Sequence, residues 1–272
     1  MAIYSDYHLH SAHSCDSRAS MESMILHGIR LDLKSLCFTE HHDIGLIPFP
    51  QSPELTFQLD TPPYYEECLR LREKYAGEIE VHFGVELGIL SHKGREITEY
   101  ASAWPFEFII ASSHLCEGID VYYPNYYRGK TKEEAYGIYF QSILDNLSVF
   151  HDFDVYGHLD YIIRYAPYEE KTYSYHTYGD YLDSILHHLI HAGKGIEINT
   201  GGIKKGLAQP HPCTEVIRRY RELGGEIITV GSDAHRPEDM ADHFRLAEDI
   251  LKECGFSYYT IFKERKPKFI RL

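Results

Sequence analysis

Short apolar segments alternate with longer segments of helical periodicity along most of the chain. Seven apolar segments have the length and residue types of buried strands, at 3–8, 35–39, 80–86, 106–112, 155–158, 195–199 and 226–231. Helices are predicted between them, at 21–29, 64–75, 132–150, 181–192, 214–223 and 237–254. Repeated strand-then-helix units predict a parallel α/β sheet. Since no Gly-rich dinucleotide fingerprint follows a strand, seven such units favour a closed or nearly closed barrel.

The chain has 272 residues, and no repeat, low-complexity tract or linker divides it. We therefore expect one domain over residues 1–272. Two connections are unusually long for such a domain: the proline-rich DIGLIPFPQSPELTFQLDTPP and the aromatic CEGIDVYYPNYYRGKT. Phe49, Phe57 and four tyrosines between 122 and 127 give them side chains to pack. Loops of this length are either functional lids or surface segments anchored by aromatic residues.

Histidine, aspartate or glutamate occurs at the end of every predicted strand. The segments, in chain order, read DYHLHS, TEHHD, GVEL, SSHL, GHLD, EINTGG and GSDAH. One such segment means little, because Asp233, for example, could simply cap a helix. In a βα barrel, however, the carboxyl ends of all strands face one mouth. Seven segments in register therefore predict one shared site there.

The residue types at these strand ends suit metal binding. His8 and His10 occupy alternate positions of one strand, so their rings project from the same face. Imidazole and carboxylate ligands suit Zn²⁺, Mn²⁺, Fe²⁺ or Co²⁺. The set exceeds the roughly four ligands of one tetrahedral ion, which indicates more than one ion and a bridging carboxylate. Glu86, the one ionisable residue of GVEL, is the candidate bridge. The chain lacks a G-x-S-x-G elbow, a P-loop and an H-E-x-x-H motif.

Charge and cysteine content narrow the partners. The formal net charge is −14, from 27 basic and 41 acidic residues. A negative charge of this size disfavours nucleic acid as a partner and suits a small, partly cationic substrate. Alternatively, the charge serves only solubility. The six cysteines form no C-x-x-C pair, which is typical of reduced thiols. With no apolar signal region and no apolar run near 20 residues, we expect a cytoplasmic protein without membrane contact.

From His8 to His235, the seven segments stand in the order of a known family. The chain resembles the polymerase-and-histidinol-phosphatase (PHP) superfamily of metallophosphoesterases, and within it the bacterial histidinol-phosphate phosphatases. The resemblance implies a distorted seven-stranded (β/α) barrel of the TIM-like kind. It also implies a trinuclear metal centre at the C-terminal mouth, which would hold three divalent ions.

Residue by residue, the resemblance implies nine metal ligands. They are His8, His10, Asp16, His41, Glu86, His114, His158, Asp233 and His235. The first two histidines and Asp233 would hold the first ion, and Glu86 would bridge it to the second, which His114 and His158 complete.

Asp16, His235 and one histidine of TEHHD would bind the third ion. The family motif places His41 on the metal and leaves His42 to face the phosphate or the leaving group. Adjacent strand residues point in opposite directions, and the sequence alone does not say which of the two points inward. Many relatives have histidine where this chain has Asp16, and His13 is the alternative ligand.

Basic residues are implied for the phosphate. Arg164 and either Lys204 or Lys205, in GGIKKG, resemble the family's phosphate anchors, and arginine can grip phosphate with two hydrogen bonds. The alternative for Arg164 is a surface ion pair with Glu169 or Glu170.

The implied activity is hydrolysis of L-histidinol phosphate to L-histidinol and phosphate, a step of histidine biosynthesis. A hydroxide bridging two ions would attack phosphorus in line. His42 or Asp160 would protonate the leaving alkoxide. One alternative is a PHP phosphoesterase acting on nucleotides or nucleic-acid ends, although the basic stripe this needs is missing. The other is a non-catalytic, metal-stabilised module.

Overall fold

A computed structural model describes residues 2–45 and 56–272. The seven expected strands are all present and form one parallel sheet in the order β1–β2–β3–β4–β7–β8–β9. They are β1 (Ser5–Leu9), β2 (Ser35–Asp43), β3 (Glu80–Gly88), β4 (Phe108–Ser112), β7 (Val155–Tyr156), β8 (Gly195–Asn199) and β9 (Ile228–Gly231).

The first and last strands of the sheet meet through the residues that follow them. The amide of His10 donates to the carbonyl of Ala234, and the amide of Asp233 donates to the carbonyl of His8, both at 2.9 Å. The side chain of Asp6 accepts from the amide of Ser232 at 2.9 Å. These bonds nearly close the sheet, which confirms the predicted barrel.

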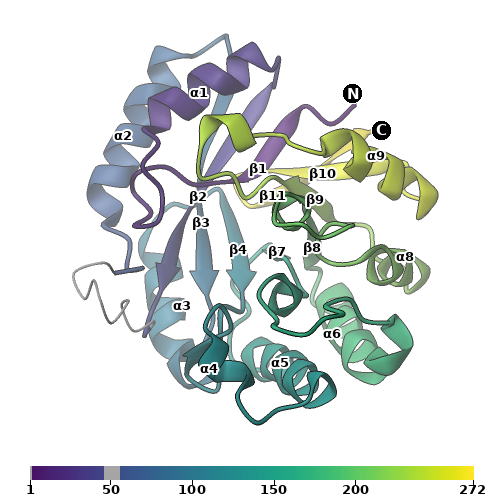
Figure 1. Ribbon diagram of the computed structural model, residues 1–272. Helices are drawn as coiled ribbons and strands as arrows, with labels where there is room; N and C mark the ends of the chain where they lie inside the picture. The colour runs from purple at the N-terminus through teal and green to yellow at the C-terminus, as the bar shows by residue number, and fades with distance from the viewer. Residues whose placement is uncertain (1, 46–55) are drawn as a thin grey trace.

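Helices surround the sheet (Figure 1). They are α1 (Met21–Arg30), α2 (Thr61–Lys74), α3 (Gly94–Ala103), α5 (Lys132–Leu147), α6 (Gly179–His191), α8 (Thr214–Glu222) and α9 (Phe244–Glu253). Five of the six predicted helices match α1, α2, α5, α6 and α8. The sixth, 237–254, is split into a 3₁₀ turn at Pro237–Asp239 and α9, because Ala241 and His243 adopt positive φ angles. Sequence periodicity missed α3, whose only buried residues are Ile97 and Ala101.

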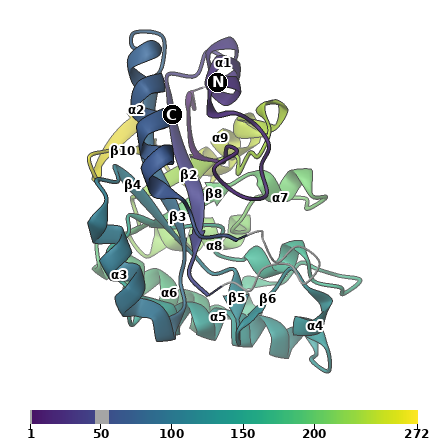
Figure 2. The ribbon, with the colours of Figure 1, turned by 90° about the vertical axis from the view of Figure 1, so that its left-hand side faces the viewer.

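A C-terminal hairpin, β10 (Tyr258–Lys263) and β11 (Lys266–Arg271), was not predicted. Its contacts fall at the amino ends of the barrel strands. Arg265 pairs with Asp154 before β7, at 2.6 Å, and its amide donates to the carbonyl of Glu107 before β4. The hairpin therefore covers the end of the barrel opposite the mouth. Figure 2 shows β10 on the left and α7 (Gly201–Lys204), which follows β8, on the right.

The second long connection carries a small hairpin, β5 (Leu115–Cys116) and β6 (Ile119–Asp120), and the short helix α4 (Pro124–Tyr127). Buried Tyr126 and Tyr127 anchor it, donating hydrogen bonds to the carbonyls of Ala135 and Val121, whereas Tyr122 is half exposed. Part of the first connection, with Phe49, lies outside the described residues. No helix in the described part of the chain could cross a membrane.

Candidate metal centre at the mouth of the barrel

Histidines and carboxylates from six strand ends converge at the mouth. Their donor atoms form four overlapping groups, each spanning no more than 4.8 Å, that could hold a metal ion. These groups are His10–His41–His235, His8–His10–Asp233, His8–Glu86–His158 and His41–Glu86–His114. The structure thus brings together eight of the nine ligands that the family resemblance implies, and the ninth, Asp16, lies against the first group.

Glu86 lies at the centre of this cluster and is fully buried. Its Oε2 is 3.2 Å from Nε2 of His8 and 2.9 Å from Nδ1 of His41. Its Oε1 is 3.2 Å from Nε2 of His114 and 2.8 Å from Nε2 of His158. Burial alone would raise the pKa of Glu86, but the surrounding imidazoles hold it well below the usual value. Each oxygen faces a different set of imidazoles, which is the arrangement that a bridging carboxylate needs.

A test of whether this cluster suits metal ions is the hydrogen bonding of its buried atoms. Six of them have no hydrogen-bond partner among the described residues: Nε2 of His8, Nε2 of His10, Nδ1 of His41, Oδ2 of Asp43, Oε2 of Glu86 and Nδ1 of His158. Leaving buried polar atoms without partners is costly. Nearly all belong to the four groups, and divalent ions coordinated by them would remove that cost.

Asp16 adds a carboxylate to the first group, His10–His41–His235. The Oδ2 of Asp16 is 3.0 Å from Nε2 of His235 and 3.6 Å from Nε2 of His41. Burial would raise the pKa of Asp16, but these two imidazoles hold it well below the usual value. His13, the alternative ligand, instead lies 2.8 Å from Glu67 on α2. The geometry therefore favours Asp16 over His13.

The structure separates the two adjacent histidines of β2. The ring of His41 points into the cluster, in register with Glu86 on β3. The ring of His42 stacks on Tyr100, with centroids 3.5 Å apart, and its Nδ1 accepts from the amide of Leu59. Burial lowers the pKa of His42 to about 4. This position does not favour the predicted contact of His42 with the substrate, because strand alternation turns its ring toward the outer layer.

Substitution of each histidine tests this assignment. We expect His41→Ala to lose metal and activity, because its ring takes part in two of the four groups. His42→Ala should keep its metal content and lose mainly stability, by about 2 kcal/mol or more, since it leaves a cavity beside Tyr100 and an unpaired amide at Leu59. Metal analysis and thermal unfolding of both variants measure this. Metal loss confined to His42→Ala would reverse the assignment.

Asp160 also differs from its expected role. It is fully buried and accepts from the hydroxyl of Tyr173 and the amide of Cys213, each at 2.9 Å, and from Nδ1 of His211 at 2.5 Å. Nε2 of His211 in turn lies 3.4 Å from Nε of Arg164. Three donors thus occupy the carboxylate of Asp160, a geometry that favours positioning of His211 behind Arg164 over the predicted protonation of the leaving group.

Two carboxylates that orient cluster histidines were missed. Glu197 on β8 is 2.7 Å from Nδ1 of His8 and accepts from the amide of His158. Asp43 is 2.6 Å from Nδ1 of His114. Burial would lower the pKa of His114, but Asp43 and Glu86 raise it to about 10. Such carboxylates fix ring orientation at metal sites. Asp43, two residues after His41 on one strand face, was detectable from the sequence.

A charged cavity of about 720 Å³ opens beside the cluster. Five cationic residues line it, Arg18, Arg164, Lys204, Lys205 and Arg236, together with five carboxylates, Asp16, Asp233, Glu238, Asp239 and Asp242. Arg164 is only 8% exposed, and its Nη1 donates to Oδ2 of Asp233 at 3.0 Å. In the described part of the chain its guanidinium is buried against Asp233, so the alternative of a surface ion pair with Glu169 or Glu170 is not observed. Lys204 pairs with Asp239. Sequence reasoning missed Arg18 and Arg236, which stand in no strand-end segment.

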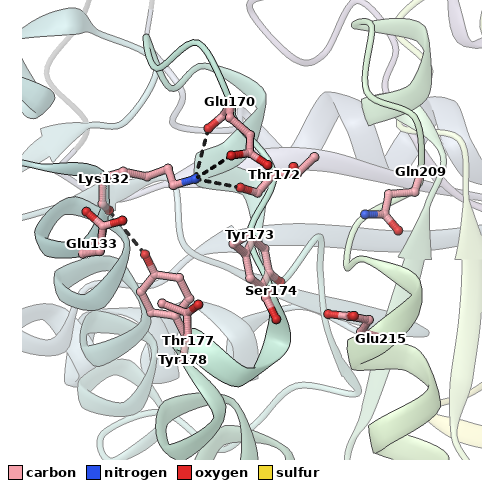
Figure 3. A pocket seen from close by; sticks show the side chains of 10 residues that line it. All are labelled: Lys132, Glu133, Glu170, Thr172, Tyr173, Ser174, Thr177, Tyr178, Gln209 and Glu215. Atoms are coloured by element: carbon pink, nitrogen blue, oxygen red, sulfur yellow. Dashed lines mark hydrogen bonds and ion pairs between the residues drawn. The ribbon is translucent and has the colours of Figure 1, made fainter.

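A further hollow, of about 580 Å³, lies away from the cluster (Figure 3). Nζ of Lys132 donates there to the carbonyls of Glu170 and Thr172. Glu133 and Glu215 also line it. It contains no member of the four metal-binding groups, so we assign no chemistry to it.

Fold and cluster together define a metal-dependent hydrolase barrel. Residues 6–201 match the family model described as the PHP domain, and the chain belongs to this family. That range includes every predicted ligand except Asp233 and His235, which the closed barrel brings to the same site.

Individual relatives are similar over nearly the whole chain. The histidinol-phosphatase of Lactococcus lactis subsp. lactis is 32% identical, over 96% of this chain and 95% of the relative. A probable histidinol-phosphatase of Clostridium acetobutylicum is 31% identical, over 97% of this chain and 98% of the relative. The crystal structure of the L. lactis histidinol phosphate phosphatase superposes with a TM-score of 0.87, covering 98% of this chain and 99% of that one. That crystal structure is a complex with zinc, L-histidinol and phosphate.

Proposed function

We propose that this protein is a metal-dependent phosphomonoesterase that hydrolyses L-histidinol phosphate to L-histidinol and phosphate. The observation that carries the proposal is the cluster of buried metal-binding groups beside a cavity lined by five cationic residues. Such a pairing suits a phosphoryl group, whose oxygens carry negative charge. Near full-length similarity to the L. lactis enzyme supports the particular substrate.

We further propose that the nine residues of the cluster hold three divalent ions within a single domain. The overlap of the four groups supports this number, because neighbouring groups share His8, His10, His41 and Glu86. Zinc is supported as one of the ions by the relative's complex. Bound ions would supply Lewis-acid activation of water and of the phosphoryl oxygens.

The chain's own residues orient the substrate. The guanidinium of Arg164 reaches the edge of the cluster, where it can donate to phosphoryl oxygens. Asp233 and the amide oxygen of Asn199 hold that guanidinium on one side, and His211 holds it on the other. A preorganised cation of this kind stabilises the charge that develops on phosphoryl oxygens at no further cost in reorganisation.

The test is reconstitution of metal-free protein with Zn²⁺, Mn²⁺, Fe²⁺ or Co²⁺, followed by assays on histidinol phosphate, nucleotides and sugar phosphates. We expect about three ions per chain and the highest kcat/KM on histidinol phosphate. A higher kcat/KM on nucleotides would support the phosphoesterase alternative. Full metal content without turnover of any phosphomonoester would support the non-catalytic alternative.

A further inference from the structure

The guanidinium of Arg164 has a hydrogen-bond partner at each of its three nitrogens. Nε donates to Nε2 of His211 at 3.4 Å, Nη1 to Oδ2 of Asp233 at 3.0 Å and Nη2 to Oδ1 of Asn199 at 3.4 Å. A guanidinium carries five N–H groups, so among the described residues these bonds leave one N–H on each terminal nitrogen. Two such N–H groups are what a bidentate contact with a phosphoryl group requires.

The ring of His211 has one orientation that satisfies both of its neighbours. A guanidinium can only donate, so Nε2 of His211 accepts from Arg164. The ring proton then lies on Nδ1, which donates to Oδ1 of Asp160 at 2.5 Å. The backbone of His211 is fixed as well, because its amide donates to the carbonyl of Asn199 at 2.9 Å and its carbonyl accepts from the amide of Asn199 at 2.7 Å. His211 is therefore held at both ring nitrogens and at the backbone.

Gly202, in the segment GGIKKG, leaves the space that this ring occupies. A Cβ atom at position 202 would lie 2.5 Å from Nε2 of His211 and 2.6 Å from its Cδ2. Real side chains do not approach so closely, and glycine is the residue that permits a close approach to the backbone. The glycine therefore allows the imidazole to pack directly against α7, the short helix that precedes Lys205.

Behind His211, the buried carboxylate of Asp160 joins the ring to two further segments. It accepts from the hydroxyl of Tyr173 and from the amide of Cys213, each at 2.9 Å. Tyr173 belongs to the wall of the hollow that lies away from the metal cluster (Figure 3). A hydrogen-bonded row thus leads from that hollow to the mouth of the barrel. We call it the relay, and it consists of Tyr173, Asp160, His211 and Arg164.

We propose that His211 and Asp160 are positioning residues for phosphate binding, which act through Arg164. By accepting from Nε, His211 keeps the guanidinium from rotating, so that its two remaining N–H groups stay directed toward the phosphoryl group. Asp160 in turn keeps the ring of His211 in the required orientation. Neither residue lines the charged cavity, so neither contacts the substrate there. This inference rests on the proposed phosphatase function and deepens it, because it assigns phosphate affinity to residues behind the cavity wall.

Two substitutions separate the two hydrogen bonds of the His211 ring. In His211→Gln, the side-chain oxygen can take the place of Nε2 and accept from Arg164. In His211→Asn, the side-chain NH₂ can take the place of Nδ1 and donate to Asp160, but the side chain is too short to reach Arg164. With the same metal loaded, we expect kcat/KM for histidinol phosphate to fall roughly tenfold to hundredfold in His211→Asn and at most about threefold in His211→Gln.

Stability does not predict this order, because each variant loses one of the two ring bonds and both should unfold at a lower temperature. If His211 served only to hold Asp160, the order of the two activities would be reversed, and that result would overturn the proposal. Phenyl phosphate should show the same ratios as histidinol phosphate, because Arg164 contacts the phosphoryl group that the two substrates share.

Combination with Arg164→Ala tests whether His211 acts through Arg164. When the guanidinium is absent, adding His211→Asn should change kcat/KM by less than about twofold, although the melting temperature should still fall. A merely structural role gives the opposite result, in which the two losses of activity multiply. Multiplied losses would therefore contradict the relay.

Tyr173→Phe tests the far end of the relay with a change too small to prevent folding. Loss of this hydroxyl leaves Asp160 with two donors, and we expect kcat/KM to fall about two- to tenfold at unchanged metal content. Tyr178→Phe is the matched control, because Tyr178 lines the same hollow but its hydroxyl donates to the carbonyl of Lys132, and its activity should not change. Equal activities of the two variants would exclude Tyr173 and Asp160 from the positioning of Arg164.

Calorimetric titration of the metal-loaded proteins with inorganic phosphate provides a readout without turnover. The Kd for phosphate should rise in His211→Asn by about the same factor as kcat/KM falls, and an unchanged Kd would overturn the positioning role. If the wild-type protein fails to hydrolyse histidinol phosphate, the proposed function fails. A weaker phosphate affinity in His211→Asn but not in His211→Gln would then still support the relay.

Discussion

Glu86→Gln is expected to lose nearly all phosphatase activity and more than one ion's share of metal. Each carboxylate oxygen of Glu86 faces two imidazoles within 3.2 Å, so under the proposed assignment its charge would serve at least two ions. Without it, two cations would face each other at roughly 3.5–4 Å with less negative charge between them. Replacing a residue that only orients a metal ligand typically lowers metal affinity or activity about 10- to 100-fold. Loss of a shared ligand should exceed that range.

Metal analysis and kcat on histidinol phosphate measure the effect. Glu80→Gln is a suitable control, because Glu80 begins the same strand but is half exposed and pairs with Lys263 at the opposite end of the barrel. Its metal content and kcat should match those of the wild-type protein. Unchanged metal stoichiometry in Glu86→Gln would contradict the bridging role.

Arg164→Ala is expected to lower kcat/KM for histidinol phosphate by about a hundredfold or more, the usual cost of removing one preorganised donor to a developing charge. Arg164→Lys should recover only part of this, since a point charge replaces a planar fork. A modest fall in melting temperature is expected for the alanine variant, because buried Asp233 loses a partner. Metal content should hold, since Arg164 donates to Asp233 but supplies no ligand.

Arg218→Ala controls for the loss of an arginine as such. Arg218 forms an exposed ion pair with Glu253 on α9, and such pairs contribute about 0–1 kcal/mol. Steady-state kinetics of the three variants distinguish a binding role from a structural one. Near wild-type kinetics in Arg164→Ala would indicate that Lys204, Lys205 or Arg18, and not Arg164, contacts the phosphate.

The strands were predictable because each combines a buried apolar run with an ionisable segment at its end. The orientation of His41 and His42 could not be predicted. Side chains alternate along a strand, so the two rings must point in opposite directions, but the sequence does not fix which of them faces inward. That choice depends on the pairing of β2 with β3, which sets His41 opposite Glu86. Pairing register depends on contacts between segments distant in sequence.

The chain direction after β7 explains why Asp160 lies away from the role predicted for it. Asp160 follows His158 by two residues, which would place both side chains on the same face of a strand. However, β7 ends at Tyr156, and a 3₁₀ turn over Tyr161–Arg164 follows. Strand alternation no longer applies there, and Asp160 turns toward Cys213. The same turn brings Arg164 to the mouth, which the family resemblance anticipated and periodicity alone did not.

Closure of the barrel has a consequence for how the protein acquires its ions during synthesis. Asp6 and Ser232, whose hydrogen bond helps to join the two ends of the sheet, are 226 positions apart. The first histidines leave the ribosome long before Asp233 and His235 exist, and domains of this size complete their long-range contacts late. Metal affinity depends on a complete, folded donor set. The ions should therefore be captured after translation, so that the loaded metal reflects the cell's available pool at that moment.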